Sequence, residues 1–227
     1  MKITPRLLVI CALFITCIIT ANTIVVKFSS FFGQILPAAV VLFPVSYIFG
    51  DILTEVYGYK TARRVIWLGF LCNLVFVFFV WVAQMLPLAP PAWVADDQSA
   101  YERVLGHTPQ VLFASFVAYL MGEFSNSFVL AKMKIATSGR WLWTRTIGST
   151  VIGQGLDSVV FLSLLAVFGV IPNAILLTVV VNHWLFKTGF EVLATPFTYG
   201  IVNYLKRKEG IDTYDRKTNF NPVLLTE

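Results

Sequence analysis

Residues 47–64 read YIFGDILTEVYGYKTARR, and this stretch decides the fold that we expect for the whole chain. It begins inside an apolar segment long enough to cross a bilayer. It also places two carboxylates, Asp51 and Glu55, four residues apart on one helix face. A carboxylate at bilayer depth costs about 3 kcal/mol or more. The stretch therefore predicts a membrane helix whose acids have a function, unless both acids only hold helices together or lie in headgroup water.

The composition of the chain is that of an integral membrane protein. Of its 227 residues, 57% are hydrophobic and 13% are charged, whereas about 25% are charged in soluble proteins. The length suits one domain. The isoelectric point near 9.2 comes from basic residues in short connections between apolar runs. Membrane topology explains that pattern, so we expect no nucleic-acid partner.

Six apolar segments are long enough to span the bilayer, at about 20 residues each. Lipid offers backbone groups no hydrogen-bond partner, so each segment should be a helix and the fold should be all-α. Residues 1–205 then form one six-helix transmembrane domain, and residues 206–227 form a short cytosolic tail against the helix ends. Residues 87–109 form an external loop with a short surface helix. The expected spans are residues 6–26, 35–57, 64–86, 110–132, 146–169 and 173–204.

Basic residues set the orientation of these spans, because cytoplasmic connections carry an excess of Lys and Arg. Fourteen of the 17 basic residues lie before the first span, in the second-to-third and fourth-to-fifth connections, and in the tail. The sequence therefore predicts a multi-pass protein with both termini in the cytoplasm.

Six ionisable side chains from four helices fall inside the expected spans. Charges in a membrane usually face the bundle interior or a watery cavity. Two amides, Asn126 and Gln154, adjoin these charges at helical spacing, and Asn22, Asn73 and Asn182 could reach the same interior. The six ionisable residues are Asp51, Glu55, Glu123, Asp157, Lys187 and Glu191.

The balance of these charges leaves several interpretations open. Five acids cannot all pair with one lysine, so some carboxylate is left for water, a proton or a ligand. Alternatively, Lys187 and Glu191 form an ion pair four residues apart, and the other acids are protonated or join helices by hydrogen bonds.

Prolines and glycines mark the same helices. Pro44 and Pro196 each remove a backbone hydrogen bond, which predicts kinks in the second and sixth spans. Gly148, Gly153 and Gly155 predict close approach of a neighbouring helix to the fifth span.

Central carboxylates, amides and aromatic rings suit a flat, polar heterocycle. A carboxylate accepts two hydrogen bonds from the amide and amino edge of a guanine-like base, and a lysine donates to its carbonyl. Aromatic faces would stack on the ring. The candidate rings are Tyr119, Phe124, Phe128, Trp184 and Phe186.

Motifs of other functional classes are absent from the sequence. The two histidines, His107 and His183, lack paired His or Cys spacing, so we expect no metal, and nothing indicates a cofactor. HExxH and GxSxG are missing, which argues against an enzyme and leaves no catalytic residue to name. GxxxxGK[ST] is also missing, so an ATPase that drives this chain would be a separate chain.

Five stretches resemble the queuosine-precursor transporter family, also called the vitamin-uptake-transporter family. The resemblance extends over nearly the whole chain, and the combination of DILTEVYGY with ARR is specific. The five stretches are FPVSYIFGDILTEVYGYKTARR (43–64), GEFSNSF (122–128), RWLWTRTIGSTVIGQGLDSVVF (140–161), NHWLFKTGFEVLATP (182–196) and DTYDRKTNFNP (212–222).

The resemblance implies six helices in a bacterial inner membrane that import deazaguanine precursors of the tRNA nucleoside queuosine, in the cyano or aminomethyl form. The partners are then a small-molecule substrate and the bilayer, and a homo-oligomer stays open. By position, the polar motif residues of the family fall on Asp51, Arg64, Glu123, Asn126, Gln154, Asp157 and Lys187.

From these residues we expect a central substrate site and a gate on the cytoplasmic side. Asp157 and Glu123 should face the base, with Lys187 as donor or counter-charge. Asp51 and Arg64 should form a gate or a structural pair. The full expected sets are Asp157, Glu123, Lys187, Asn126, Gln154 and Glu191 for substrate, and Asp51, Glu55 and Arg64 for the gate or structural role.

A second function of the same class stays open beside this one. The chain would then carry a vitamin or another nucleobase, either alone or as the substrate-binding subunit of an ATP-driven uptake system. The sequence also leaves open whether transport is coupled to protons or is facilitated diffusion.

Overall fold

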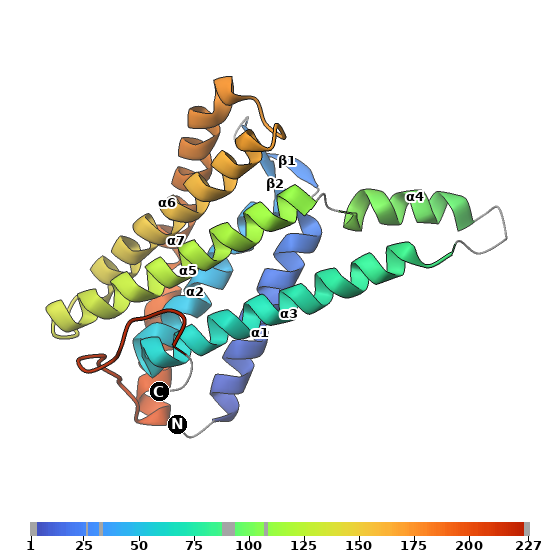
Figure 1. The fold of residues 1–227 in the computed structure, drawn as a ribbon. Helices are drawn as coiled ribbons and strands as arrows, with labels where there is room; N and C mark the ends of the chain where they lie inside the picture. Colours follow the sequence, from blue (N-terminus) through green and yellow to red (C-terminus); the bar gives the residue numbers. More distant parts are fainter. Residues whose placement is uncertain (1–3, 26, 32–33, 88–93, 107–108, 225–227) are drawn as a thin grey trace.

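The computed structural model describes residues 4–25, 27–31, 34–87, 94–106 and 109–224. Long helices form a bundle in which the first and last helices meet at one end (Figure 1). A two-stranded hairpin lies at the opposite end, and one short helix projects from the side of the bundle (Figure 1). The bundle helices are α1 (Pro5–Ile24), α2 (Phe43–Ile52), α3 (Tyr59–Met85), α5 (Pro109–Ala136), α6 (Leu142–Val167) and α7 (Leu176–Glu209).

The six expected spans correspond to these six helices, with α2 prolonged by a π-helical turn, η2 (Leu53–Tyr57). Within the described part of the chain, five segments are long and apolar enough to cross a membrane. Helix α7 is not among them, because polar residues such as His183, Lys187 and Glu191 interrupt its apolar run. The five segments are Pro5–Ile24, Ala38–Tyr57, Tyr59–Met85, the segment Gln98–Ala136 that contains α5, and Leu142–Val167.

The expected helix from residue 35 is wrong in its first part. Strands β1 (Phe28–Phe31) and β2 (Gln34–Pro37) form an antiparallel hairpin, and a 3-10 turn, η1 (Ala38–Val41), leads into α2. Helix α2 begins only at Phe43, and Pro44 occupies its first turn, where its missing N–H is no loss. Pro44 therefore starts a helix instead of kinking one, whereas Pro196 does lie inside α7.

The short helix expected between the third and fourth spans is present as α4 (Val94–Leu105). It extends sideways from the bundle in Figure 1. At the far end of the bundle, another 3-10 turn, η3 (Asn173–Ile175), joins α6 to α7.

Small residues let α5 and α6 approach each other closely. A Cβ added at Gly153 of α6 would lie 2.7 Å from the Cβ of Asn126 and 2.9 Å from the carbonyl oxygen of Gly122, both on α5. The contact at the neighbouring Gly148 is less tight, because a Cβ there would meet only the flexible end of the Met133 side chain. The close approach expected for the fifth span is therefore centred on Gly153.

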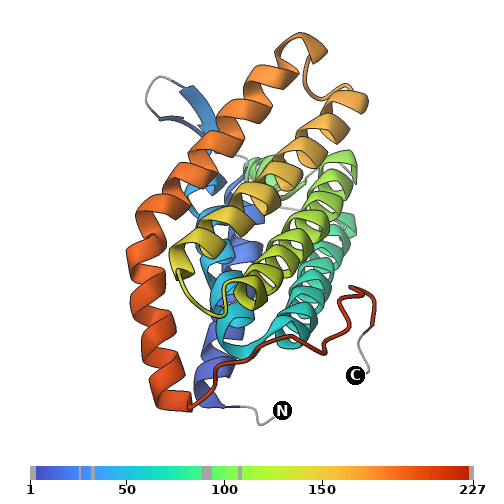
Figure 2. The ribbon, with the colours of Figure 1, turned by 90° about the vertical axis from the view of Figure 1, so that its left-hand side faces the viewer.

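The chain after α7 crosses the ends of the other helices (Figure 2). Asp215 accepts a hydrogen bond from the backbone N–H of Tyr59 at 2.9 Å and so caps the start of α3. The buried guanidinium of Arg63 donates from Nη1 to the carbonyl oxygens of Asn219 and Asn221 at 2.9 and 2.7 Å. Helix α7 itself continues to Glu209, past the expected boundary at residue 205.

The turn between η2 and α3 depends on Gly58. Its φ of +85° is a conformation that strains other residues. A Cβ there would also lie 2.6 Å from Cγ2 of Thr213, so the tail packs directly against this turn. The start of α1 reaches the same end of the bundle, where Thr4 donates to Glu209 at 2.8 Å.

We predict that Gly153→Ala destabilises the bundle by about 1–3 kcal/mol, because the new methyl group would meet backbone and Cβ atoms that cannot move aside. Gly189→Ala is the matched control, since no atom lies within 4 Å of a Cβ at that position on α7. The control should melt at or above the wild-type temperature, because alanine favours helix over glycine. Thermal unfolding of the purified proteins in detergent would measure both, and equal melting temperatures for the two variants would refute the close packing.

Candidate functional site

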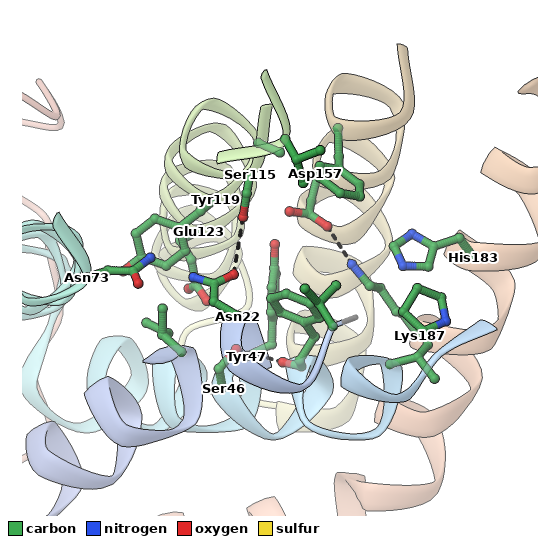
Figure 3. Close-up of a pocket in the computed structure, with 18 of the residues that line it drawn as sticks. Asn22, Ser46, Tyr47, Asn73, Ser115, Tyr119, Glu123, Asp157, His183 and Lys187 are labelled. Atoms are coloured by element: carbon green, nitrogen blue, oxygen red, sulfur yellow. Dashed lines mark hydrogen bonds and ion pairs between the residues drawn. The ribbon is translucent and has the colours of Figure 1, made fainter. Parts of the chain in front are cut away.

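A pocket opens between the helices (Figure 3), and Pro37 at the end of the hairpin is among the residues that line it. The space free of protein atoms is about 850 Å³ when the open solvent at its mouth is counted, whereas the space open to the centres of water-sized molecules is about 50 Å³. The polar residues that line it are Asn22 from α1, Ser46 and Tyr47 from α2, Asn73 from α3, Ser115, Tyr119 and Glu123 from α5, Asp157 from α6, and His183 and Lys187 from α7.

The pocket contains one ion pair, between α6 and α7. Nζ of Lys187 lies 2.5 Å from Oδ2 of Asp157, and the lysine side chain is almost fully buried. The same ammonium group lies 4.8 Å from the ring centre of Phe43. An ammonium group has three donors, so Lys187 can hold Asp157 and still donate to a ligand. The alternative pair between Lys187 and Glu191 does not form.

Glu123 stands opposite this ion pair and is the least satisfied group of the pocket (Figure 3). Its side chain is fully buried, and neither carboxylate oxygen has a hydrogen-bond partner among the described residues. It fits against α2 because Gly50 has no side chain, since a Cβ there would lie 2.9 Å from Oε2 of Glu123. Most buried polar groups in proteins are paired. Two free acceptor oxygens leave Glu123 able to accept hydrogen bonds from a molecule in the pocket.

Other polar lining groups are held in place by neighbours. Ser115 donates to the side-chain oxygen of Asn22 at 3.3 Å, and the hydroxyl of Tyr119 donates to the carbonyl oxygen of Ile66 at 3.0 Å. Nδ1 of His183 lies 3.1 Å from the hydroxyl of Ser158. Asn22 and Asn73 reach the interior as expected, whereas Asn182 does not line the pocket.

The aromatic part of the prediction is mostly wrong. Of the five expected rings, only Tyr119 lines the pocket. The others serve helix packing, as when Trp184 donates to the carbonyl oxygen of Val151 at 2.9 Å. The rings that do line the pocket beside Tyr119 are Phe43, Tyr47 and Phe161. Apolar rings are so common in this sequence that no pattern distinguishes these from the lipid-facing ones.

A second layer of polar residues lies one helical turn from the pocket, toward the tail. It consists of Asp51, Asn126, Gln154 and Glu191, all fully buried, and none of the four lines the pocket. Nδ2 of Asn126 donates to Oδ1 of Asp51 at 2.7 Å. The six expected substrate residues thus divide into two groups. Glu123, Asp157 and Lys187 lie in the pocket, and the rest lie in this second layer.

A buried ion cluster follows at the tail end of the bundle and is centred on Glu55. Arg145 of α6 binds both carboxylate oxygens of Glu55 at 2.8 Å. Lys206 of α7 lies 2.5 Å from Glu55, and Lys134 of α5 lies 3.4 Å from it. Asp212 of the tail completes the ion cluster by binding Lys134 and Lys206 at 2.6 and 2.9 Å.

The ion cluster excludes one alternative for Glu55 and changes one expectation about Asp51. Glu55 lies in the protein interior with three cations, not in headgroup water. Asp51 is buried and bonded to Asn126, whereas its expected partner Arg64 is exposed on α3. The neighbouring Arg63 is the buried arginine and binds the tail.

Sequence reasoning assigned the cations of the ion cluster to connections and the tail, and so missed their role. Helical spacing could have indicated that Lys134 is buried, because it follows Ser127 by seven residues on the buried face of α5. Burial raises the pKa of Asp212, but the hydrogen bonds from Lys134 and Lys206 outweigh burial and hold the pKa below its usual range. Asp212 is therefore ionised at neutral pH.

The pocket offers few ligands to a resident metal ion. No group of three or more His, Cys, Asp or Glu side chains is placed to hold a metal ion in the described ranges. What the pocket offers instead is one free carboxylate, one ion pair with spare donors, and aromatic faces. That set can bind a planar molecule with hydrogen-bonding edges.

Comparisons with known proteins agree on one class. A model of the putative vitamin uptake transporter family matches residues 37–201, nearly three quarters of the chain. A protein of Bacillus subtilis (strain 168) named probable queuosine precursor transporter is 29% identical over 192 residues, which cover 84% of this chain and 82% of that protein. No solved structure matches. The matched residues 37–201 contain the pocket residues of α2, α3, α5, α6 and α7.

We predict that Glu55→Gln destabilises the protein by about 3–5 kcal/mol, because it removes the central charge of the ion cluster and leaves buried cations unpaired. The control is Glu102→Gln, the same chemical change on the exposed surface of α4. Membrane levels and melting temperatures of both variants would measure the effect. A Glu55→Gln protein that melts like the control would mean that the ion cluster does not stabilise the fold.

Proposed function

The chain belongs to the putative vitamin uptake transporter family, and on this premise we propose that it imports a deazaguanine precursor of queuosine. The proposed place of action is the inner membrane of a bacterium, and the imported base would serve tRNA modification. The named relative from Bacillus subtilis supports the substrate. The five apolar segments support a protein that crosses the membrane several times.

The free carboxylate of Glu123 is the observation that carries this substrate. A deazaguanine presents an amide N–H and an amino group side by side on one edge, and a carboxylate accepts from both in parallel. Glu123 has both oxygens free for such a pair. The ring carbonyl lies next to the amide N–H on the same edge, within the range of a donor such as Lys187.

The ion pair of Asp157 and Lys187 supplies the remaining polar contacts in this proposal. Lys187 donates to the ring carbonyl, and Asp157 both holds the lysine and accepts from the far side of the base. Tyr119 and Phe161 offer faces for stacking. A buried site with paired polar groups rejects bases that lack the matching donors, because those groups would then be left unpaired.

The gate in this proposal is the ion cluster around Glu55, and not a pair of Asp51 and Arg64. The cluster joins α5, α6, α7 and the tail. It lies between the pocket and the tail end of the bundle, and the basic residues predict that this end is cytoplasmic. In alternating access the base would enter from the hairpin side. It would leave after these ion pairs separate.

We predict that Glu123→Gln weakens uptake by about 10- to 100-fold at low substrate concentration, because a hydrogen bond to a charged group is worth about 1.5–3 kcal/mol. The variant should melt at or above the wild-type temperature, since it removes a buried carboxylate that has no hydrogen-bond partner among the described residues. This opposite effect on stability and uptake separates a binding role from a structural one.

The measurement is complementation in a bacterium that cannot make queuosine precursors and lacks its own importer. Each precursor is fed at low concentration, and queuosine in tRNA is scored for the wild type, Glu123→Gln and the control Glu102→Gln. Unchanged queuosine in Glu123→Gln would contradict the binding role. No queuosine with wild-type protein in the membrane would move the substrate to a vitamin or another nucleobase.

Asp157→Asn should also impair uptake with the protein present in the membrane. It additionally leaves Lys187 without its partner, and removing one member of a buried ion pair costs about 3–5 kcal/mol. We therefore expect this variant to lose both uptake and melting temperature. Full uptake by Asp157→Asn would remove Asp157 from the proposed site.

A further inference from the structure

Each residue of the second layer lies about one helical turn closer to the tail than a pocket residue on the same helix. Asp51 follows Tyr47 by four residues on α2, and Asn126 follows Glu123 by three on α5. On α6, Gln154 precedes Asp157 by three, and on α7, Glu191 follows Lys187 by four. Residues three or four apart share a helix face, so the faces that build the pocket also bring the second layer together.

The charges of the second layer are not balanced by the protein. Asp51 and Glu191 interact electrostatically, and neither forms an ion pair in the described part of the chain. The nearest lysine, Lys187, is bound to Asp157. A buried pair of like charges without a counter-ion costs far more than either charge alone.

The free atoms of the second layer are mostly acceptors. Five oxygens have no hydrogen-bond partner among the described residues: Oδ2 of Asp51, both carboxylate oxygens of Glu191, and the amide oxygens of Asn126 and Gln154. The one unpartnered amide donor of this layer is Nε2 of Gln154. The amide of Asn126 is fixed against Asp51 by its own hydrogen bond, so its free oxygen lies beside that carboxylate.

An excess of buried oxygens over donors is the chemistry of a cation site, because hard cations prefer carboxylate and amide oxygens. The backbone next to Asp51 is irregular as well. Helix α2 turns into a π-helix at Leu53, and such π-turns are frequent at functional sites. Coupling ions in membrane transporters bind where helices are discontinuous.

We propose that the second layer binds one monovalent cation, a proton or Na⁺, between Asp51 and Glu191, with the amide oxygens of Asn126 and Gln154 as further ligands. A single positive charge suits the site, because no group of three or more His, Cys, Asp or Glu side chains is placed to hold a metal ion within the described ranges. The site stands on its own geometry. Its use as the driving ion of transport rests on the proposed function.

The charges around this site connect it to the pocket. Asp51 also interacts electrostatically with Glu123 on the pocket side and with Glu55 on the tail side, and Glu123 interacts with Glu191. A cation in the second layer therefore lowers the cost of the ionised Glu123 that would receive the base. Binding of the base and binding of the cation favour each other.

The first test needs no transport substrate. The full chain, purified in detergent, is melted at constant ionic strength in NaCl or choline chloride, and at a series of pH values. Na⁺ binding should raise the wild-type melting temperature by about 3 °C or more in NaCl. Proton binding should instead give a protonated-carboxyl band in infrared difference spectra between high and low pH.

Glu191→Gln should lose the response that the wild type shows, and Glu102→Gln should keep it. Asp51→Asn gives the same test from α2. A wild type with neither the Na⁺ shift nor the carboxyl band would overturn the proposal, and so would a Glu191→Gln protein that keeps the response. Either positive arm identifies the ion.

A second test separates coupling from transport itself. Proteoliposomes with the full chain are loaded with unlabelled base, and exchange with labelled base is measured without gradients. Uptake of labelled base is then measured with a proton gradient or a Na⁺ gradient. No exchange would contradict the proposed function and leave the cation site to the melting and infrared tests. Exchange without any response to either gradient would overturn the coupling role.

Discussion

The structure depends on one constraint, which is that carboxylates must lie inside an apolar bundle where each unpaired charge is costly. The three polar levels along the bundle axis meet this constraint in different ways. In the ion cluster, Glu55 is surrounded by cations from α5, α6 and α7. In the pocket, Asp157 is paired and Glu123 is not. In the second layer no cation is present among the described side chains. The free energy stored in unpaired groups therefore lies where a transporter would bind its ligands.

Small residues make this arrangement possible. The absence of a side chain at Gly50 leaves space for Glu123, and the contact of Gly122 with Gly153 brings α5 and α6 together at the level of the pocket. Tyr47 occupies the space beside Gly122. Close backbone approach lets short polar side chains meet across helices, which larger residues would hold apart. The polar side chains and the glycines therefore depend on each other. Weakening the contact between α5 and α6 would also disturb the arrangement of the site.

The sequence predicts the parts of this structure that follow from periodicity and cost. Long apolar runs predict the six helices, and the expense of an intramembrane charge identifies Asp51, Glu123, Asp157, Lys187 and Glu191 as interior residues. Partners are a different matter, because they depend on how far each helix is rotated and shifted. Spacing alone allowed Lys187 to pair with Glu191 as readily as with Asp157. The family resemblance led us to pair Asp51 with Arg64, whereas the buried arginines are Arg63 and Arg145. The second strand of the hairpin was missed because it runs directly into the apolar residues 38–43, with which it reads as one segment.

Charge balance connects the proposed substrate to the proposed cation site. The cyano form of a deazaguanine is neutral, so in this proposal it would satisfy the oxygens of Glu123 with hydrogen bonds but bring no positive charge to the buried carboxylates. A cation in the second layer would then supply the offsetting charge before the ion cluster opens. The aminomethyl form carries an ammonium group at neutral pH, as lysine does, and brings one positive charge of its own. If the proposed site is correct, its excess of buried carboxylate favours the aminomethyl form on electrostatic grounds, and an accompanying cation matters most for the cyano form.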